Sequence, residues 1–175
     1  IYIQTGVLGR AAQMNFGAKT ATGDILVFLH ADVKPPATFV DDIRNSILNG
    51  YEFGFFAYQF APSFFMLDIN AVFTNRKGLF AGGGDQIHYM TRSLFNCMGG
   101  YDEKYTIMED FDFMRRFKKL RKPFDIIQQK ATVSSRKYIN NSWLRVNFAN
   151  LIAFILFSFN TKPDLIKKWY YKILR

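Results

Sequence analysis

The chain has 175 residues, of which 49% are hydrophobic, and this composition is ample for one buried core. It excludes a disordered tail or a linker. The single cysteine, Cys97, excludes a disulfide framework and a paired-cysteine zinc site, so we expect a protein of a reducing, cytoplasmic compartment.

The positive charge is concentrated in the C-terminal third. The formal net charge is +9. Residues 1–112 contain 8 basic and 12 acidic side chains, whereas residues 113–175 contain 15 basic and 2 acidic ones. A basic surface favours an anionic partner: a membrane surface, a nucleic acid or a phosphorylated small molecule. The strongly apolar stretch 151–159 is shorter than the ~20 residues that span a bilayer, and the first ten residues do not resemble a signal peptide.

The first part of the chain alternates between helix and strand patterns. Apolar residues at helical spacing predict a helix over residues 11–22, which Gly23 ends. The unbroken apolar run 25–29 follows, a pattern typical of a parallel strand buried on both faces. After a Pro-Pro pair, an apolar stripe predicts a helix over residues 37–48.

The same alternation continues to the end of the chain. We expect strands over residues 51–60, 86–90 and, as short pieces, 124–135. We expect helices over residues 64–74, 108–120, 143–159 and 165–174, and a short one that ends at Gly99. The expected fold class is therefore α/β, with one domain over residues 1–140 and C-terminal helices over 141–175 that pack on the same domain.

His30 and Asp32 follow the apolar run, at the edge where open α/β sheets bind their ligands. An imidazole and a carboxylate separated by one residue can both face a divalent cation. Manganese or magnesium shared with a nucleotide diphosphate suits such donors. The alternative is a strand-end turn in which Asp32 accepts backbone hydrogen bonds.

Other chemistry-bearing residues also have two interpretations. Glu109 and Asp110 cap a helix start, or one of them acts as a general base in a cleft. The loop Gly82–Gly84 permits close approach to a ligand, or it is a flexible turn. The basic run 115–122 meets phosphates, or it forms a solvated helix face. His88 is expected to be packed or to line a pocket.

Four phenylalanines of the last long apolar helix are interpreted as core, with a membrane-facing stripe as the alternative: Phe148, Phe154, Phe157 and Phe159.

Four motifs occur in a specific order. They are GRAAQMN at residues 9–15, FLHAD at 28–32, GDQ at 84–86 and MED at 108–110. In this order they resemble the family 2 glycosyltransferases, which have the nucleotide-diphospho-sugar transferase (GT-A) fold. More narrowly, they are similar to a bacterial subgroup associated with radical-SAM and selenium-domain genes.

The resemblance implies transfer of a sugar, with inversion, from a nucleoside-diphosphate donor to an acceptor hydroxyl. It implies that Asp32 binds manganese or magnesium with His30 as an accessory ligand. It also implies that Asp110 is the general base and Glu109 its supporting neighbour. Contact with the donor or acceptor is implied for four further residues: Arg10, Asn15, Asp85 and Arg136.

The chain also departs from the family pattern. Relatives begin with a segment that holds the base and ribose of the donor, and this sequence starts after it. We therefore expect a truncated protein with an incomplete donor site and a sheet edge that a second copy can cover. The QxxRW motif of processive synthases is absent, so one sugar per encounter is expected.

The basic C-terminal third bears on the partners. A lipid-linked acceptor fits peripheral contact with the inner membrane face. A nucleic-acid partner is not expected, since no RNA-binding motif occurs. The alternative function is a non-catalytic basic module that docks on an anionic membrane or nucleic acid.

Overall fold

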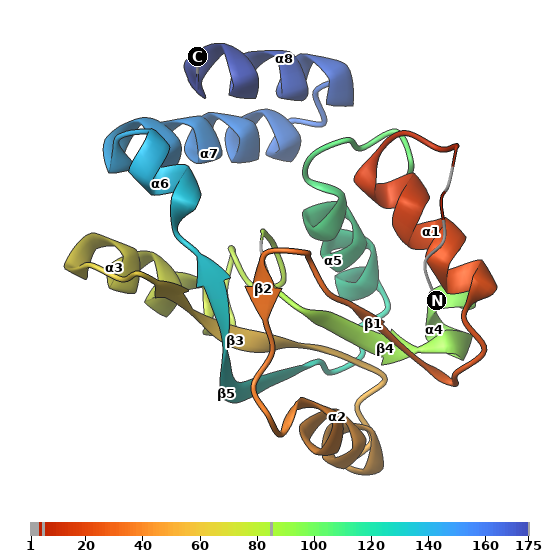
Figure 1. Ribbon diagram of the computed structural model, residues 1–175. Helices are drawn as coiled ribbons and strands as arrows, with labels where there is room; N and C mark the ends of the chain where they lie inside the picture. Colours follow the sequence, from red (N-terminus) through yellow and green to blue (C-terminus); the bar gives the residue numbers. More distant parts are fainter. Residues whose placement is uncertain (1–3, 5, 85, 175) are drawn as a thin grey trace.

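The computed structural model describes residues 4, 6–84 and 86–174, and a five-stranded mixed sheet flanked by helices dominates it (Figure 1). The α/β class is thereby confirmed. In chain order the elements are α1 (Arg10–Thr20), β1 (Ile25–Phe28), β2 (Val33–Lys34), α2 (Phe39–Leu48), β3 (Phe53–Ala61), α3 (Phe65–Thr74), β4 (His88–Thr91), α4 (Arg92–Cys97), α5 (Glu109–Lys119), β5 (Asp125–Ser134), α6 (Arg136–Asn140), α7 (Trp143–Ser158) and α8 (Pro163–Leu174).

The strand order is β1-β4-β3-β5-β2, and β3 and β5 form the parallel pair. The prediction of a buried parallel strand over residues 25–29 is wrong. β1 lies at the sheet edge and pairs antiparallel with β4. Leu26 is buried, but Val27 is 39% exposed. An apolar run of this length is shared by central strands and by edge strands that a helix partly covers, so the pattern cannot distinguish them.

Three short-range features also differ from the prediction. Residues 125–134 form one continuous strand, β5, rather than several short ones, and an irregularity in its register against β3 interrupts the apolar alternation. β2 and α6 were not predicted, because two and five residues are too few for a periodic pattern.

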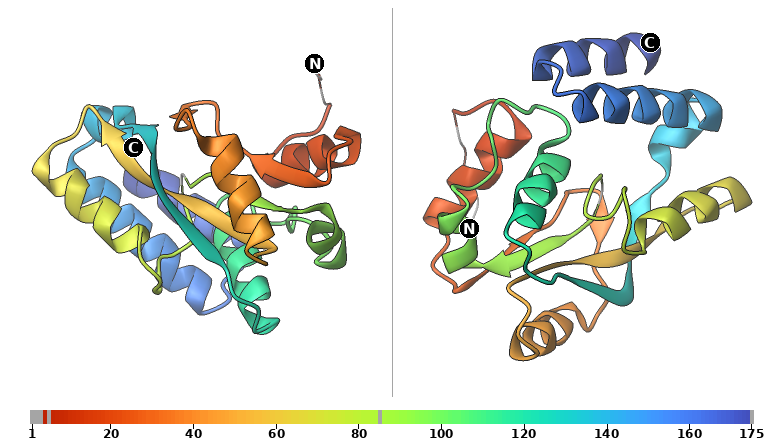
Figure 2. Two further views of the ribbon diagram at one scale, coloured as in Figure 1. Left: turned by 90° about the horizontal axis from the view of Figure 1, so that it is seen from below. Right: turned by 180° about the vertical axis from the view of Figure 1, so that it is seen from behind.

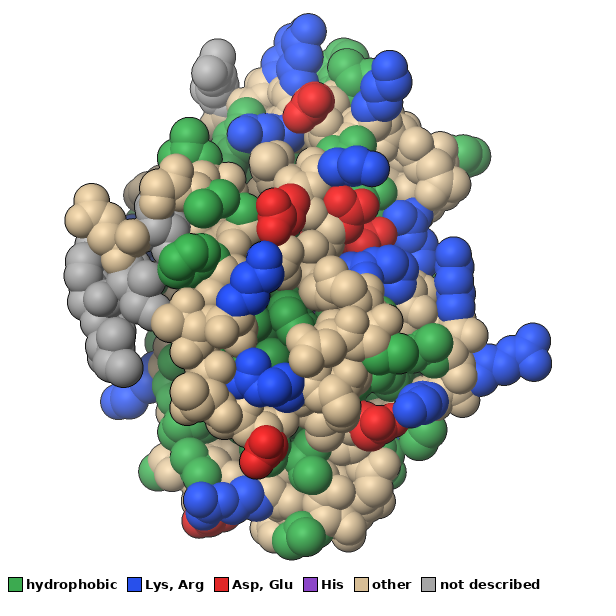
Figure 3. Space-filling view, turned by 90° about the vertical axis from the view of Figure 1, so that its right-hand side faces the viewer, with side chains coloured by type: hydrophobic (Ala, Val, Ile, Leu, Met, Phe, Trp, Pro, Cys, Tyr) green, Lys and Arg blue, Asp and Glu red, His purple; other side chains and the backbone are tan. Residues whose placement is uncertain are grey.

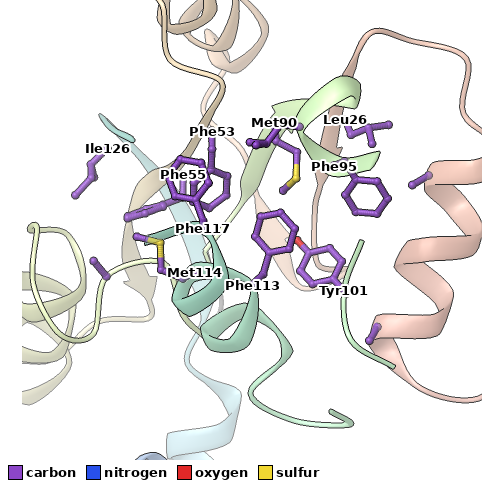
Figure 4. Close-up of a cluster of buried hydrophobic side chains, with 14 residues drawn as sticks. Leu26, Phe53, Phe55, Met90, Phe95, Tyr101, Phe113, Met114, Phe117 and Ile126 are labelled. Carbon is purple, nitrogen blue, oxygen red and sulfur yellow. The ribbon is translucent and has the colours of Figure 1, made fainter. Parts of the chain in front are cut away.

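The core has one cluster on each face of the sheet. In the first, Phe53 and Phe55 of β3 pack against Phe113 and Phe117 of α5 (Figure 4). The second holds Phe56 of β3 with side chains of α2 and α3. The alternation of Phe55 and Phe56 between the clusters follows from the two-residue period of a strand. Together these contacts hold the start of α5 above the sheet, near α1 (Figure 2).

The C-terminal helices only partly match the core interpretation. Phe157 is buried, and Phe154 packs against Phe80 and Phe111 with ring centroids 5.0 and 5.4 Å apart. Phe148 and Phe159 are exposed, so the core prediction is wrong for these two. No helix in the described part of the chain is long and apolar enough to cross a membrane.

The basic run 115–122 is largely engaged within the protein. Arg115 and Arg116 pair with the buried Asp112 at 2.9 and 2.7 Å. Arg116 also donates to two backbone carbonyls of the loop that precedes α5. Lys122 pairs with Glu52. These contacts favour a structural role for much of the run over one in binding phosphates.

The glycine loop before β4 packs directly against α5. A Cβ atom added to Gly83 would lie 2.1 Å from the Phe111 ring. Glycine at position 83 therefore lets the loop pack closely against a helix of the same chain.

Substitution of this glycine should destabilise the fold. Gly83→Ala should lower the free energy of unfolding by about 1–3 kcal/mol, because Phe111 must shift. Gly17→Ala is the matched control: its position in α1 is open, so alanine should raise that free energy by about 0.5–1 kcal/mol. Urea denaturation of both variants measures the difference. Equal midpoints would show that the loop does not constrain position 83.

Candidate functional site

An open cleft of about 770 Å³ lies between α1 and the edge strand β1. Arg10 and Met14 of α1 line one side, and residues 25–32 line the other. His30 and Asp32 therefore stand at the rim, directly after β1. On the right-hand side of Figure 1, where α1 lies, the surface mixes Lys and Arg with Asp and Glu, so no single charge dominates it (Figure 3).

Arg10, which lines this cleft, joins three sequence-predicted site residues: His30, Glu109 and Asp110. Its Nε lies 3.0 Å from Glu109 Oε1, and its Nη2 lies 3.7 Å from Asp110 Oδ2. The same Nη2 lies 2.9 Å from His30 Nε2 and 3.0 Å from its Nδ1. A guanidinium only donates, so in a hydrogen bond with Arg10 the His30 ring nitrogen is the acceptor. The structure thus brings together residues 10, 30, 109 and 110 from three separate segments.

Glu109 and Asp110 are buried, with 1% and 5% of their surface exposed. Arg10 forms an ion pair with Glu109, but its geometry does not make a hydrogen bond, and neither Glu109 oxygen has a hydrogen-bond partner among the described residues. The buried hydroxyl of Thr106 has no such partner either. A buried carboxylate with unused acceptor sites is costly and is suited to receive a hydrogen bond or a proton.

The backbone before α5 aims these acids toward Arg10. Met108 precedes the helix with a φ of 69°, in the left-handed region that residues other than glycine rarely adopt. Non-glycine residues in this region cost about 1 kcal/mol or more and cluster at functional sites. The helix then starts at Glu109, and its first turn also favours the negative charges through the helix dipole.

Behind the Arg10 cluster, the buried His88 and Tyr101 form a hydrogen-bonded pair, and His88 also contacts the glycine loop. His88 Nε2 lies 2.9 Å from the Gly82 carbonyl, and the Tyr101 hydroxyl lies 3.3 Å from His88 Nδ1. The pKa of His88 is lowered from 6.5 to about 3, chiefly by burial and then by the nearby His30 and Arg10, against the hydrogen bond to the Gly82 carbonyl, which raises it. Burial, then the charges of Asp110 and Glu109, raise the pKa of Tyr101 well above its usual value. Both groups are therefore neutral at physiological pH.

The buried His88 should make stability depend on pH. The unfolded chain binds a proton at His88 below about pH 6.5, whereas the folded chain does not until about pH 3. Stability should therefore fall as the pH drops below 6.5, with a slope approaching about 1.4 kcal/mol per pH unit.

His88→Gln removes this titration and keeps a donor for the Gly82 carbonyl. Urea midpoints between pH 7.5 and about 5, above the carboxylate range, should decline more steeply in the parent protein than in the variant. Parallel declines would mean that His88 does not carry the effect.

The residues present fit a divalent metal only with help from a ligand. Among the described residues, no group of three His, Cys, Asp or Glu side chains could hold a metal ion. Asp32 is exposed at the cleft rim, and His30 is close to the Arg10 cation. Magnesium accepts a site in which oxygens of a diphosphate complete the coordination provided by two protein donors.

Two further predicted residues, Asn15 and Arg136, lie apart from the Arg10 cluster. Asn15 is buried and donates to the Tyr101 carbonyl at 2.9 Å, so it braces the loop before α5. Arg136 is exposed at the start of α6. It lies two residues after Ser134, whose N–H donates to the Asp32 carbonyl, so the backbone brings Arg136 near the cleft rim. Asp85 lies outside the described residues.

Sequence reasoning missed the residues that support the cluster. Tyr101 carries no recognisable motif of its own, and the left-handed Met108 has no sequence signature. His88 was expected to be packed or pocket-lining, and it is buried behind the site.

Comparison of the chain with family models and with curated proteins found no match. The features that bear on function are therefore those of the cluster itself. Two buried carboxylates, a guanidinium and an imidazole meet beside an open cleft. Such a set can accept a proton from a bound hydroxyl and bind an anion.

Proposed function

We propose that this chain carries the catalytic centre of an inverting, non-processive glycosyltransferase with a GT-A-type fold. It moves a sugar from a nucleoside diphosphate to an acceptor hydroxyl. The observation that carries the proposal is the meeting of the buried Glu109 and Asp110 with Arg10, which itself lines the cleft. A basic module that docks on an anionic surface would require the basic residues but would not require a buried pair of acids.

Asp110 is the general base in this proposal. The acceptor hydroxyl attacks the anomeric carbon from the face opposite the diphosphate, and its proton passes to the Asp110 carboxylate. A new carbon–oxygen bond forms as the bond to the diphosphate breaks, and its electron pair leaves with the diphosphate. Because this is a single displacement, the configuration at the anomeric carbon inverts.

Arg10 and Glu109 act as a pair around the base. Glu109 holds the Arg10 guanidinium by an ion pair of 3.0 Å, and the guanidinium stands 3.7 Å from Asp110. A cation at this place stabilises the ionised carboxylate and is available to the negative charge that develops on the leaving diphosphate. Arg136 provides a second cation near the rim.

Asp32 and His30 would hold a divalent metal together with the diphosphate. When bound, manganese or magnesium stabilises the charge on the leaving group as a Lewis acid. The exposed position of Asp32 at the cleft rim is compatible with this role.

A donor screen tests the proposal. The full-length gene product is incubated with a panel of UDP-, GDP- and dTDP-sugars, with and without manganese, and the released nucleoside diphosphate is measured. We expect release from at least one donor, and more of it with manganese. Binding to anionic vesicles or nucleic acid without release from any donor would contradict the proposal and favour the docking module.

A further inference from the structure

Helix α7 is apolar on two opposite sides. Its buried side, with Val146, Ala149 and Ala153, faces the protein. The other side bears a stripe of exposed side chains, the α7 stripe, at spacings of three and four residues: Leu144, Phe148, Leu151, Ile155 and Phe159. Leu144 and Phe159 are 72% and 81% exposed. A contiguous apolar surface of this kind is uncommon on a protein without a partner, so the α7 stripe is a candidate contact surface.

The apolar surface continues onto the neighbouring helix. α8 returns antiparallel along α7, and the buried Ile166 and the half-buried Tyr170 make the contact (Figure 1). Leu165 and Trp169, each one residue before these two, are 44% and 46% exposed. Helical geometry places them on the flank of α8 that adjoins the α7 stripe. The exposed tryptophan gives this surface an aromatic residue of the kind that gathers at membrane interfaces.

The same segment is strongly basic. Residues 136–175 contain eight Lys and Arg but a single acid, Asp164. Among the described residues of this segment, six cations are exposed: Arg136, Arg145, Lys162, Lys167, Lys168 and Lys172. Unlike Arg115 and Arg116, the lysines of α8 at positions 167, 168 and 172 make no ion pair among the described residues.

We propose that the α7 stripe, with Leu165 and Trp169, docks this protein on an anionic lipid bilayer. The apolar side chains enter the boundary between headgroups and acyl chains, and the exposed cations of the same C-terminal segment meet the lipid phosphates. A second copy of the chain is the weaker fit, because face-to-face docking would bring the cations of both copies together. This surface is separate from the Arg10 cluster, so the inference stands independently of sugar transfer.

Vesicle co-sedimentation tests the apolar part. The full chain should bind vesicles of equal phosphatidylcholine and phosphatidylglycerol, and Phe148→Ser and Phe159→Ser should each weaken binding about tenfold. Leu48→Ser is the matched control: Leu48 is 83% exposed but lies on α2, at the opposite end of the molecule, and its replacement should change nothing. Equal binding by all three variants would overturn the proposal.

Lysine substitutions and salt dependence test the electrostatic part of the proposal. Lys167→Ala and Lys168→Ala should each weaken binding about fivefold, and binding should fall between about 0.01 M and 1 M salt. Pure phosphatidylcholine should bind far less. The emission of Trp169 should shift to shorter wavelength on binding, and Trp169→Phe should remove that shift. Salt-independent binding, an unchanged Trp169, or a dimer in solution that Phe148→Ser dissociates would contradict lipid docking, the last in favour of a second copy.

Discussion

Asp110→Asn should lower the turnover of sugar transfer by about 10²-fold or more and leave donor affinity nearly unchanged. Asparagine preserves the size of the side chain but cannot take the proton of the acceptor hydroxyl. The measurement is steady-state release of nucleoside diphosphate, with donor binding followed separately by calorimetry.

Asp102→Asn is the matched control for this experiment. Asp102 lies in the loop before α5 and accepts a hydrogen bond from the Lys104 N–H, which an asparagine oxygen can also accept. Asp102 is not one of the residues that meet at Arg10, so the turnover of Asp102→Asn should match that of the parent protein. Near-normal turnover in Asp110→Asn would return Glu109 and Asp110 to the role of helix capping.

Asp32→Ala should abolish the manganese-dependent part of nucleotide-sugar binding, whereas His30→Ala should only weaken it. The reason is that a carboxylate is the stronger ligand for a hard cation, and His30 already contacts Arg10. Calorimetric titration of donor in the presence and absence of manganese measures both effects.

Asp41→Ala tests whether loss of any surface acid has the same effect. Asp41 is exposed on α2, where its partner is Arg44, and its removal should not change donor binding. Unchanged affinity of Asp32→Ala in manganese, in a folded protein, would remove the metal assignment.

The sequence predicted most helices and strands because their apolar spacing is set by the local backbone. The edge position of β1 was not predicted, because it depends on which strands pair with β1 in the folded sheet. All four phenylalanines of residues 143–159 were also assigned to the core, which is wrong for Phe148 and Phe159. Phe157 and Phe159 are two residues apart on a helix, so they face different directions, and only the packing partners decide which one is buried.

The candidate site could be predicted only in part. Motif order singled out Arg10, His30, Glu109 and Asp110, and these four residues do meet in space. The buried partners behind them follow from the fold, since Tyr101 contributes through its burial and proximity rather than through a motif. The role of Asn15 in bracing the Tyr101 loop likewise required long-range contacts.

The central claim is that Asp110 serves a single displacement at an anomeric carbon. The most direct measurement is proton NMR of the first product formed from a nucleotide sugar that the full-length protein consumes, with Asp110→Asn run in parallel. The account predicts a product whose anomeric configuration is opposite to that of the donor, formed at least about 10²-fold more slowly by the variant. Retention of configuration, or equal rates with and without the Asp110 carboxylate, would contradict it.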